Sequence, residues 1–264
     1  DGRALRRSVS DNLTWIGQAS FLIQLGGKNL LIDPVLSRSL GFIKRNSPPG
    51  LDWPAMPKID VVFITHNHRD HMDAPTLKRI GPAPVYVVPK GLGKWFLHNG
   101  FPRVVEMGWW QEESIEGLDV TFVPAEHWSR RSLTDINTSW WGGYVIARNG
   151  LRIYHCGDTG WFDGFSQIAQ RFPGIHAAMM PTGAYAPRWF MRAQHIDPEE
   201  AVKAFKIIGA RQFVGMHWGT FKLSDEPLDE PMHVLPEIWE KEELERTRLE
   251  TGTLGKILRL DTLA

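Results

Sequence analysis

The stretch Thr65-His66-Asn67-His68-Arg69-Asp70-His71 decides which fold and which chemistry we expect of this chain. It follows the apolar run 61–64, which predicts a buried strand with polar groups at its C-terminal end. The first two histidines alternate along the backbone and can reach one metal ion, whereas the aspartate and the last histidine lie past a bend and can face a second. Burying three histidines and a carboxylate this close together is costly without a metal. The stretch therefore predicts a metal site rather than a polar loop that only leads into the next helix.

Further ligand-type side chains stand where other strands are expected to end. His127, Asp158 and His217 follow apolar runs at 120–123, 151–154 and 213–216. Because α/β folds place their sites at the C-terminal ends of strands, these side chains are candidates to complete four-coordinate ions. Taken one at a time, Asp158 could be a turn residue, and either histidine could be a satisfied core residue.

Apolar runs alternate with short helical patterns along the whole chain, which favours one α/β domain over residues 1–264. Strands are predicted at 21–25 and 30–33, on either side of the Gly26-Gly27 turn, and at 61–64, 85–88, 120–123, 144–147, 151–154, 177–180 and 212–216. Helices are predicted after the capping residues Asp73 and Asp197 and across 232–244. Residues 1–12 are expected to form an N-terminal extension, and the Pro- and Gly-rich stretch 40–57 a long loop or lid.

Composition limits the partners and compartments to expect. The chain has 30 basic and 30 acidic residues, so its charge balance does not call for nucleic acid. No apolar stretch approaches the roughly 20 residues of a membrane-spanning helix. The single cysteine, Cys156, excludes an internal disulfide, and the start at Asp1 leaves open an upstream targeting segment. We expect a cytoplasmic or peripheral-membrane protein, with the periplasm or cell envelope left open.

The order His-x-His-x-Asp-His, followed by a histidine, an aspartate and another histidine, resembles the ligand pattern of the metallo-β-lactamase superfamily. The resemblance implies a four-layer αββα sandwich with two metal ions in the cleft between its sheets. It implies a ligand set of His66, His68 and His127 for a first zinc ion, Asp70, His71 and His217 for a second, and Asp158 as the bridge. Zinc suits histidine-rich ligation, and manganese or iron can occupy such sites.

A closer resemblance lies in 183–201, which reads Gly-Ala-Tyr-Ala-Pro-Arg-Trp-Phe-Met-Arg-Ala-Gln-His-Ile-Asp-Pro-Glu-Glu-Ala. This segment looks like the N-acyl-phosphatidylethanolamine-hydrolysing phospholipase D family, as do 127–131, 157–160 and 217–221, and the likeness covers the chain from about Leu13 to about Phe221. It implies catalytic roles for Asp70 and His195 and substrate contacts by Tyr185, Arg188 and Gln194. On the residues alone, His195 could be a loop histidine bonded to backbone, and Arg188 could form a structural ion pair.

The implied function is a dinuclear zinc phosphodiesterase of phospholipase D type, which cleaves N-acyl phosphatidylethanolamine or a related lipid through a hydroxide shared by the metals. Two divalent ions, two aspartates and a hydroxide leave a net charge of about +1, which suits a monoanionic phosphodiester. The alternatives are a lactonase or esterase acting on a small anionic substrate and, from another class, a non-catalytic metal-binding module. The complete set of ligands argues against the module.

Twelve tryptophans bear on the partners of the chain. Their plainer explanation is core packing, and the functional one is an apolar substrate groove or a surface that touches lipid. We therefore expect a phospholipid substrate with peripheral membrane contact, and the sequence leaves a homodimer open.

Overall fold

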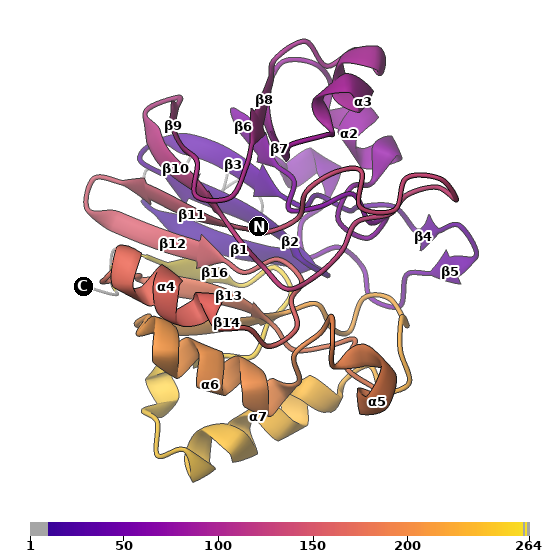
Figure 1. The fold of residues 1–264 in the computed structure, drawn as a ribbon. Coiled ribbons are helices and arrows are strands. Elements are labelled where there is room, and N and C mark those ends of the chain that lie inside the picture. The colour runs from indigo at the N-terminus through magenta and orange to yellow at the C-terminus, as the bar shows by residue number, and fades with distance from the viewer. Residues whose placement is uncertain (1–9, 261, 263–264) are drawn as a thin grey trace.

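Two seven-stranded sheets pack face to face in the computed structural model, which describes residues 10–260 and 262 (Figure 1). The first sheet has the order β16-β1-β2-β3-β6-β7-β8, with β1 at Asn12–Gly17, β2 at Ser20–Leu25, β3 at Lys28–Ile32, β6 at Val61–Phe63, β7 at Val85–Pro89, β8 at Val104–Met107 and β16 at Ile257–Arg259. The second has the order β15-β14-β13-β12-β11-β10-β9, with β9 at Glu112–Ile115, β10 at Leu118–Val123, β11 at Gly143–Arg148, β12 at Leu151–His155, β13 at Ala177–Pro181, β14 at Gln212–Met216 and β15 at Leu249–Glu250.

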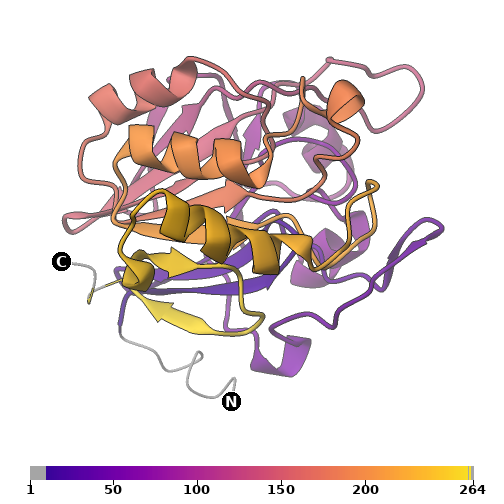
Figure 2. The ribbon, with the colours of Figure 1, turned by 90° about the horizontal axis from the view of Figure 1, so that it is seen from below.

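Helices cover the outer face of each sheet. The first sheet carries α2 (Ala74–Ile80) and α3 (Gly93–His98), and the second carries α4 (Gly164–Arg171), α6 (Pro198–Ile208) and α7 (Glu230–Lys241). Figure 2, seen from below, shows α4, α6 and α7 side by side in front of the second sheet. The predicted αββα sandwich is therefore confirmed.

The alternation of side chains along β2 shows why the layers form. Phe21 and Ile23 point into the core shared by the two sheets, whereas Leu22 packs on the other face with Leu77 of α2 and Phe96 of α3. A strand that is apolar on both faces can be satisfied only inside a layered structure, because both faces must be covered.

The topology brings the C-terminal ends of several strands to one edge of the sandwich. In the first sheet β3, β6, β7 and β8 run parallel, and in the second β12, β13, β14 and β15 do. Strand β10 runs in the same direction as β12, because each is antiparallel to β11. The segments after β6, β10, β12 and β14 therefore meet at this edge.

Most predicted elements are confirmed within one or two residues, including the hairpin around Gly26-Gly27. Asp197 caps α6 through a capping box with Glu200, as its sequence indicates. Asp73 stands at the N-cap of α2, but its carboxylate accepts hydrogen bonds from side-chain hydroxyls instead of helix N–H groups. The helix predicted at 232–244 begins earlier, at Glu230, because Pro231 fits the first turn, and it ends earlier, at Lys241.

Two predicted regions lie at the margins of the sandwich. Residues 1–9 of the expected N-terminal extension lie outside the described residues, and Asn12 already begins β1. The stretch 40–57 contains parts of the two-stranded ribbon of β4 (Ser39–Leu40) and β5 (Ile43–Lys44), then a short 3-10 helix at Trp53–Ala55. Among the helices of residues 10–260 and 262, none has the length and apolar character needed to cross a membrane.

Candidate metal centre

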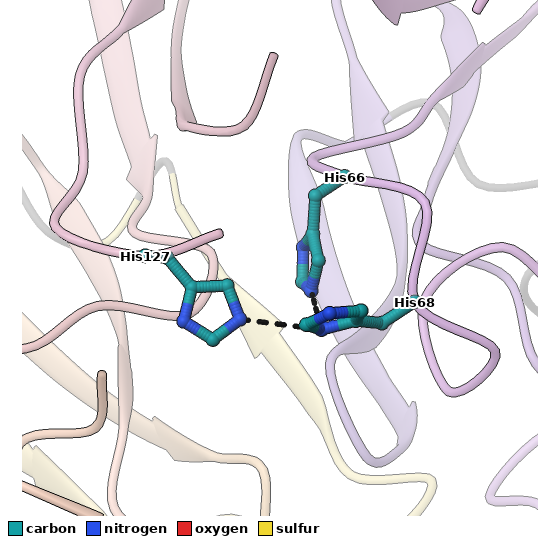
Figure 3. Close-up of side chains that lie close together, drawn as sticks. All are labelled: His66, His68 and His127. Atoms are coloured by element: carbon teal, nitrogen blue, oxygen red, sulfur yellow. Dashed lines mark hydrogen bonds between the residues drawn. The ribbon is translucent and has the colours of Figure 1, made fainter. Parts of the chain in front are cut away.

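Three histidine rings converge where β6 and β10 end (Figure 3). Nε2 of His66 lies 2.9 Å from Nδ1 of His68, which lies 3.3 Å from Nε2 of His127. Nitrogens that ligate one tetrahedral ion at 2.0–2.1 Å are about 3.3 Å apart, so this spacing fits a shared ion. The edge of the Trp128 ring system packs on His68, with ring centroids 4.7 Å apart, and limits how that imidazole can turn.

A second group lies beside the first and is built from Asp70, His71, Asp158 and His217. Nε2 of His71 lies 3.2 Å from Nε2 of His217, and Oδ2 of Asp70 lies 3.2 Å from the same nitrogen of His217. The structure thus brings together all seven side chains that the sequence predicts as ligands.

Asp158 stands between the two groups. Its Oδ2 is 3.1 Å from Nε2 of both His71 and His217, and 3.9 Å and 3.8 Å from Nε2 of His66 and His127. An oxygen in this position can serve either group, which is the arrangement expected of a bridging ligand. Its other oxygen, Oδ1, is buried without a hydrogen-bond partner among the described residues.

The donor set itself tests whether a cation fits. Nδ1 of His71 faces a carboxylate oxygen of Asp33 at 2.7 Å, and Nδ1 of His127 faces the carbonyl of Gln194 at 3.0 Å. Because each Nδ1 must donate to an acceptor, the lone pair of each Nε2 points into the cluster. Several lone pairs and two carboxylates that converge in one buried place need positive charge between them, so the residues fit a metal.

The electrostatics agree with metal ligation. Burial lowers the pKa of His66 and of His127 well below the usual value, so both rings are neutral at pH 7, as ligands must be. Burial also opposes the charged form of His217 and His71. The Asp158 carboxylate nevertheless raises the pKa of His217 to about 9 and that of His71 well above its usual value. A bound cation would take over the role of these protons and release them.

Asp33 contacts both the ligand loop and one of the clustered histidines, although no role was predicted for it from the sequence. Its side chain is fully buried, and it accepts hydrogen bonds from the Thr65 backbone N–H at 2.7 Å and the Thr65 hydroxyl at 2.6 Å, besides facing His71. It therefore fixes both the start of the ligand loop and the orientation of one ligand. The available signal was its place directly after the apolar strand β3, the same signal that singled out Asp158.

Arg131 also holds the ligand loop. Its Nη1 donates to the carbonyl of Met72 at 2.7 Å and to that of Asn67 at 3.2 Å. The loop that carries the ligands is thus tied to the segment between β10 and β11, which stabilises the relative position of the two sheets at this edge.

A cleft of about 910 Å³ opens over the cluster. Its floor includes His68, Asp70, Asp158, His195 and His217. Its walls are mostly apolar and consist of Leu40, Phe42, Ile43, Trp128, Leu133, Ala184, Phe190, Met191 and Leu223, with the three arginines Arg69, Arg130 and Arg131 among them. The arrangement can therefore hold a molecule with a long apolar part and an anionic group near the metals.

The predicted catalytic and substrate-contacting residues fall into two sets. His195 and Gln194 line the cleft, and Nδ1 of His195 lies 4.0 Å from Oδ2 of Asp158. Burial lowers the pKa of His195 to about 4, so its ring is neutral at pH 7. Tyr185 and Arg188 are not among the lining residues.

Tyr185 and Arg188 have other partners. The Tyr185 hydroxyl donates to a carboxylate oxygen of Glu230 on α7. The Arg188 guanidinium donates to the carbonyl of His195 at 2.7 Å and to Glu200 on α6 at 2.7 Å. Arg188 therefore supports the backbone of His195 instead of facing the cleft.

Comparison with known proteins adds to this geometry. The family model described as the beta-lactamase superfamily domain matches residues 28–218. The chain is 35% identical to N-acyl-phosphatidylethanolamine-hydrolyzing phospholipase D 1 of Caenorhabditis elegans over 92% of this chain and 74% of that protein. It is 36% identical to the mitochondrial protein of the same activity from Saccharomyces cerevisiae, of which it spans half the length. It is also 32% identical to a metal-dependent hydrolase of Methanopyrus kandleri, over 84% of that protein.

Solved structures share the architecture. The isothiocyanate hydrolase from Delia radicum gut bacteria superposes with a TM-score of 0.77 over 94% of this chain and 98% of that one, at 20% identity. At this identity the likeness concerns the fold alone, and it matches the two-sheet sandwich described above.

Proposed function

Because this chain belongs to the beta-lactamase superfamily of metal-dependent hydrolases, we propose that it is a dinuclear zinc phosphodiesterase of phospholipase D type. The proposed substrate is N-acyl phosphatidylethanolamine or a related lipid phosphodiester, and the products are an N-acylethanolamine and a phosphatidic acid. The relatives from C. elegans and S. cerevisiae carry that activity in their names.

The observation that carries the proposal is the composition of the cleft. The lining combines the ligand cluster, the three arginines and a majority of apolar side chains among the remaining residues. A small anionic substrate has no use for apolar walls of this extent, whereas a lipid has both an anionic phosphate and acyl chains. Ile43, Met191 and Leu223 would contact the chains, and Arg69 and Arg130 would pair with the phosphate.

In this proposal one ion would be held by His66, His68 and His127, and the other by Asp70, His71 and His217, while Asp158 would be available to both. When bound, two zinc ions supply Lewis acidity and lower the pKa of a shared water to about 7. The chain does the remaining work through its own side chains.

Asp70 and His195 are the side chains proposed to act on the substrate and its water. Oδ2 of Asp70 accepts a hydrogen bond from Gln18 Nε2 at 3.0 Å, which fixes the carboxylate facing the cleft floor. This carboxylate would orient the attacking water. The His195 ring, whose backbone carbonyl accepts a hydrogen bond from Arg188, would hydrogen-bond the phosphate or the leaving oxygen.

Zinc-loaded protein tests the proposal on three substrates: N-acyl phosphatidylethanolamine in detergent micelles, an aryl phosphodiester and an aliphatic lactone. We expect kcat/KM for the lipid to exceed that for the lactone at least about tenfold, a preference that the anionic-plus-apolar cleft supports. Preference for the lactone, or no turnover of either phosphodiester at full metal occupancy, would overturn the proposal.

A matched pair of histidine variants controls this assay. His66→Ala should lose activity at least about a thousandfold, because a ligand is removed. His233→Ala changes a histidine whose side chain is 64% exposed on α7, and it should keep wild-type activity.

A further inference from the structure

Three segments at the mouth of the cleft end in exposed apolar side chains. Phe42, at the turn between β4 and β5, is 94% exposed, and Leu133, in the segment between β10 and β11, is 85% exposed. On α5 (Arg188–Met191), Trp189 is 82% and Phe190 62% exposed. We call these four residues the docking rim.

The docking rim is one surface although its members are far apart in sequence. Phe42, Leu133 and Phe190 line the same cleft, and Trp189 precedes Phe190 on α5 with the two ring centroids 5.7 Å apart. In both Figure 1 and Figure 2, the β4–β5 ribbon and α5 extend from the same side of the sandwich. The apolar tips therefore surround the opening through which a substrate reaches the metal centre.

Packing does not explain these side chains. A phenylalanine that is 94% exposed contributes little to the core, and exposed apolar residues that gather at one place mark an interaction surface. Among the other exposed apolar side chains of the described residues, Ile136 lies in the same segment as Leu133. Trp109 and Trp140, each 38% exposed, contact each other with ring centroids 4.8 Å apart, and they are not among the residues that line the cleft. The remaining ones stand on separate segments: Leu97 on α3, Trp161 before α4, Ile207 on α6, Met232 on α7 and Ile257 on β16. Such scattered residues need no special explanation.

The charge around the docking rim indicates what covers it. The segments 37–46, 128–134 and 186–194 contain no aspartate or glutamate, although acidic and basic residues are equal in number over the chain. Asp135 directly follows the second segment, and its carboxylate accepts hydrogen bonds from the backbone N–H groups of Arg131 and Ser132. Arg38 and Lys44 are exposed on the ribbon, Arg192 follows α5, and Arg130 and Arg131 lie beside Leu133. Aromatic and aliphatic tips among basic residues are the composition that binds the interface of an anionic bilayer.

We propose that the docking rim inserts into the surface of an anionic lipid bilayer, so that the cleft opens directly onto the membrane. This inference builds on the proposed lipid substrate and adds the surface through which the lipid is reached. A lipid could then move from the bilayer into the cleft without exposing its acyl chains to water.

Vesicle sedimentation tests the proposal with zinc-loaded full chain. The probe is vesicles of phosphatidylglycerol and phosphatidylcholine, compared with vesicles of phosphatidylcholine alone. We expect wild type to bind the anionic vesicles more tightly, and the triple variant Phe42→Ser/Leu133→Ser/Trp189→Ser to bind them about tenfold more weakly or worse. Equal binding by wild type and this variant, or no binding by wild type, would overturn the proposal that the docking rim binds the membrane.

A control variant has the same chemistry on other surfaces. Leu97→Ser/Ile207→Ser/Met232→Ser should bind vesicles within about twofold of wild type, since it changes only scattered side chains. Zinc content and melting temperature, measured for both triple variants, show that each is folded. If light scattering shows a wild-type dimer that the rim substitutions dissociate, a second copy covers the surface and the proposal is wrong.

Micelle assays separate this proposal from the proposed function. If vesicle binding depends on the docking rim but the lipid is not hydrolysed in micelles, membrane docking is supported and the proposed phospholipase function is wrong. If the lipid is hydrolysed in micelles but vesicle binding does not depend on the docking rim, the proposed function is supported and the proposed membrane docking is wrong.

Discussion

At the floor of the cleft the side chains are buried and tied to the protein, whereas at its rim they are exposed and make few contacts. His71 and Asp158 are under 4% exposed, and His71 is oriented by Asp33, which is in turn held by Thr65. Phe42 and Leu133 protrude from segments outside the two sheets, the β4–β5 turn and the connection 124–142. This difference indicates that the two parts of the cleft have different tasks. The floor holds its side chains in fixed positions, as activation of water requires, whereas the exposed rim suits contact with a deformable surface such as a lipid bilayer.

The largest effect should come from Asp70→Asn, which changes the floor with almost no change in volume. The carboxylate loses its charge and with it its value as a ligand and as a partner of the attacking water. Activity on the aryl phosphodiester should fall at least about a thousandfold. If activity survives while both metals remain bound, as measured by elemental analysis, the two-metal mechanism is wrong.

Metal removal should affect the floor and leave the rim unchanged, because only the floor residues would bind the ions. At about a hundredfold excess over Kd, a metal stabilises the folded state by about 2.7 kcal/mol. For a protein of this size, chelation should then lower Tm by roughly 5–10 °C, measured by calorimetry. An unchanged Tm after complete chelation would mean that the buried histidine cluster is stable without a cation.

Asp33→Asn tests whether the support beneath the floor matters as much as the ligands. The amide cannot stabilise the His71 ring as a carboxylate does, so zinc affinity should fall by about 10- to 100-fold in a competition assay with a chelating dye. Asp119→Asn, on an exposed position of β10, is the matched control and should leave the affinity unchanged.

Arg131→Met tests the link between the segment that bears Leu133 and the loop that carries the ligands. It removes the hydrogen bonds to the carbonyls of Met72 and Asn67 and should cost about 1–3 kcal/mol in the free energy of unfolding. Arg130→Met, its neighbour in the same segment, should cost less than about 0.5 kcal/mol by denaturant titration. Equal costs would show that the loop does not depend on this clamp.

The smallest effect should come from Phe42→Ala, which should change the free energy of unfolding by less than about 0.5 kcal/mol. Phe63→Ala, at a fully buried position of β6, should cost about 3–5 kcal/mol by the same measurement. A large cost at Phe42 would indicate that the ribbon is part of the core, and the distinction between a packed floor and an exposed rim would then be wrong.

The sequence predicts the floor better than the rim for a physical reason. The strands and the seven clustered side chains could be predicted because apolar runs that end in ligand-type residues constrain both the sheet and its edge. The role of Asp33 was not predicted, because a single acidic residue after a strand resembles an ordinary turn residue. Tyr185 and Arg188 lie in a segment that resembles a known family, but resemblance does not specify the direction in which a side chain points.

The rim could not be predicted from periodicity, because exposure follows from the absence of contacts. Phe42 lies in a stretch expected to be a loop or lid, and only the structure shows the ribbon of β4 and β5 and the exposed ring at its turn. Strand β1 was also missed, although Leu13 and Trp15 alternate with polar residues along it. Strands β8, β9, β15 and β16 were missed because these short segments have little apolar alternation.

The contacts of Arg131 have a consequence for how such a protein can be remodelled. The β4–β5 ribbon could be exchanged for another sequence as a cassette, because the ligands are held by other segments. The segment that bears Leu133 is not free in the same way, since any graft there must keep a guanidinium that reaches the carbonyls of Met72 and Asn67. Substitutions in the β4–β5 ribbon can therefore change the substrate range without moving the ligands. Substitutions in the segment that bears Leu133 are constrained, because that segment also holds the ligand loop.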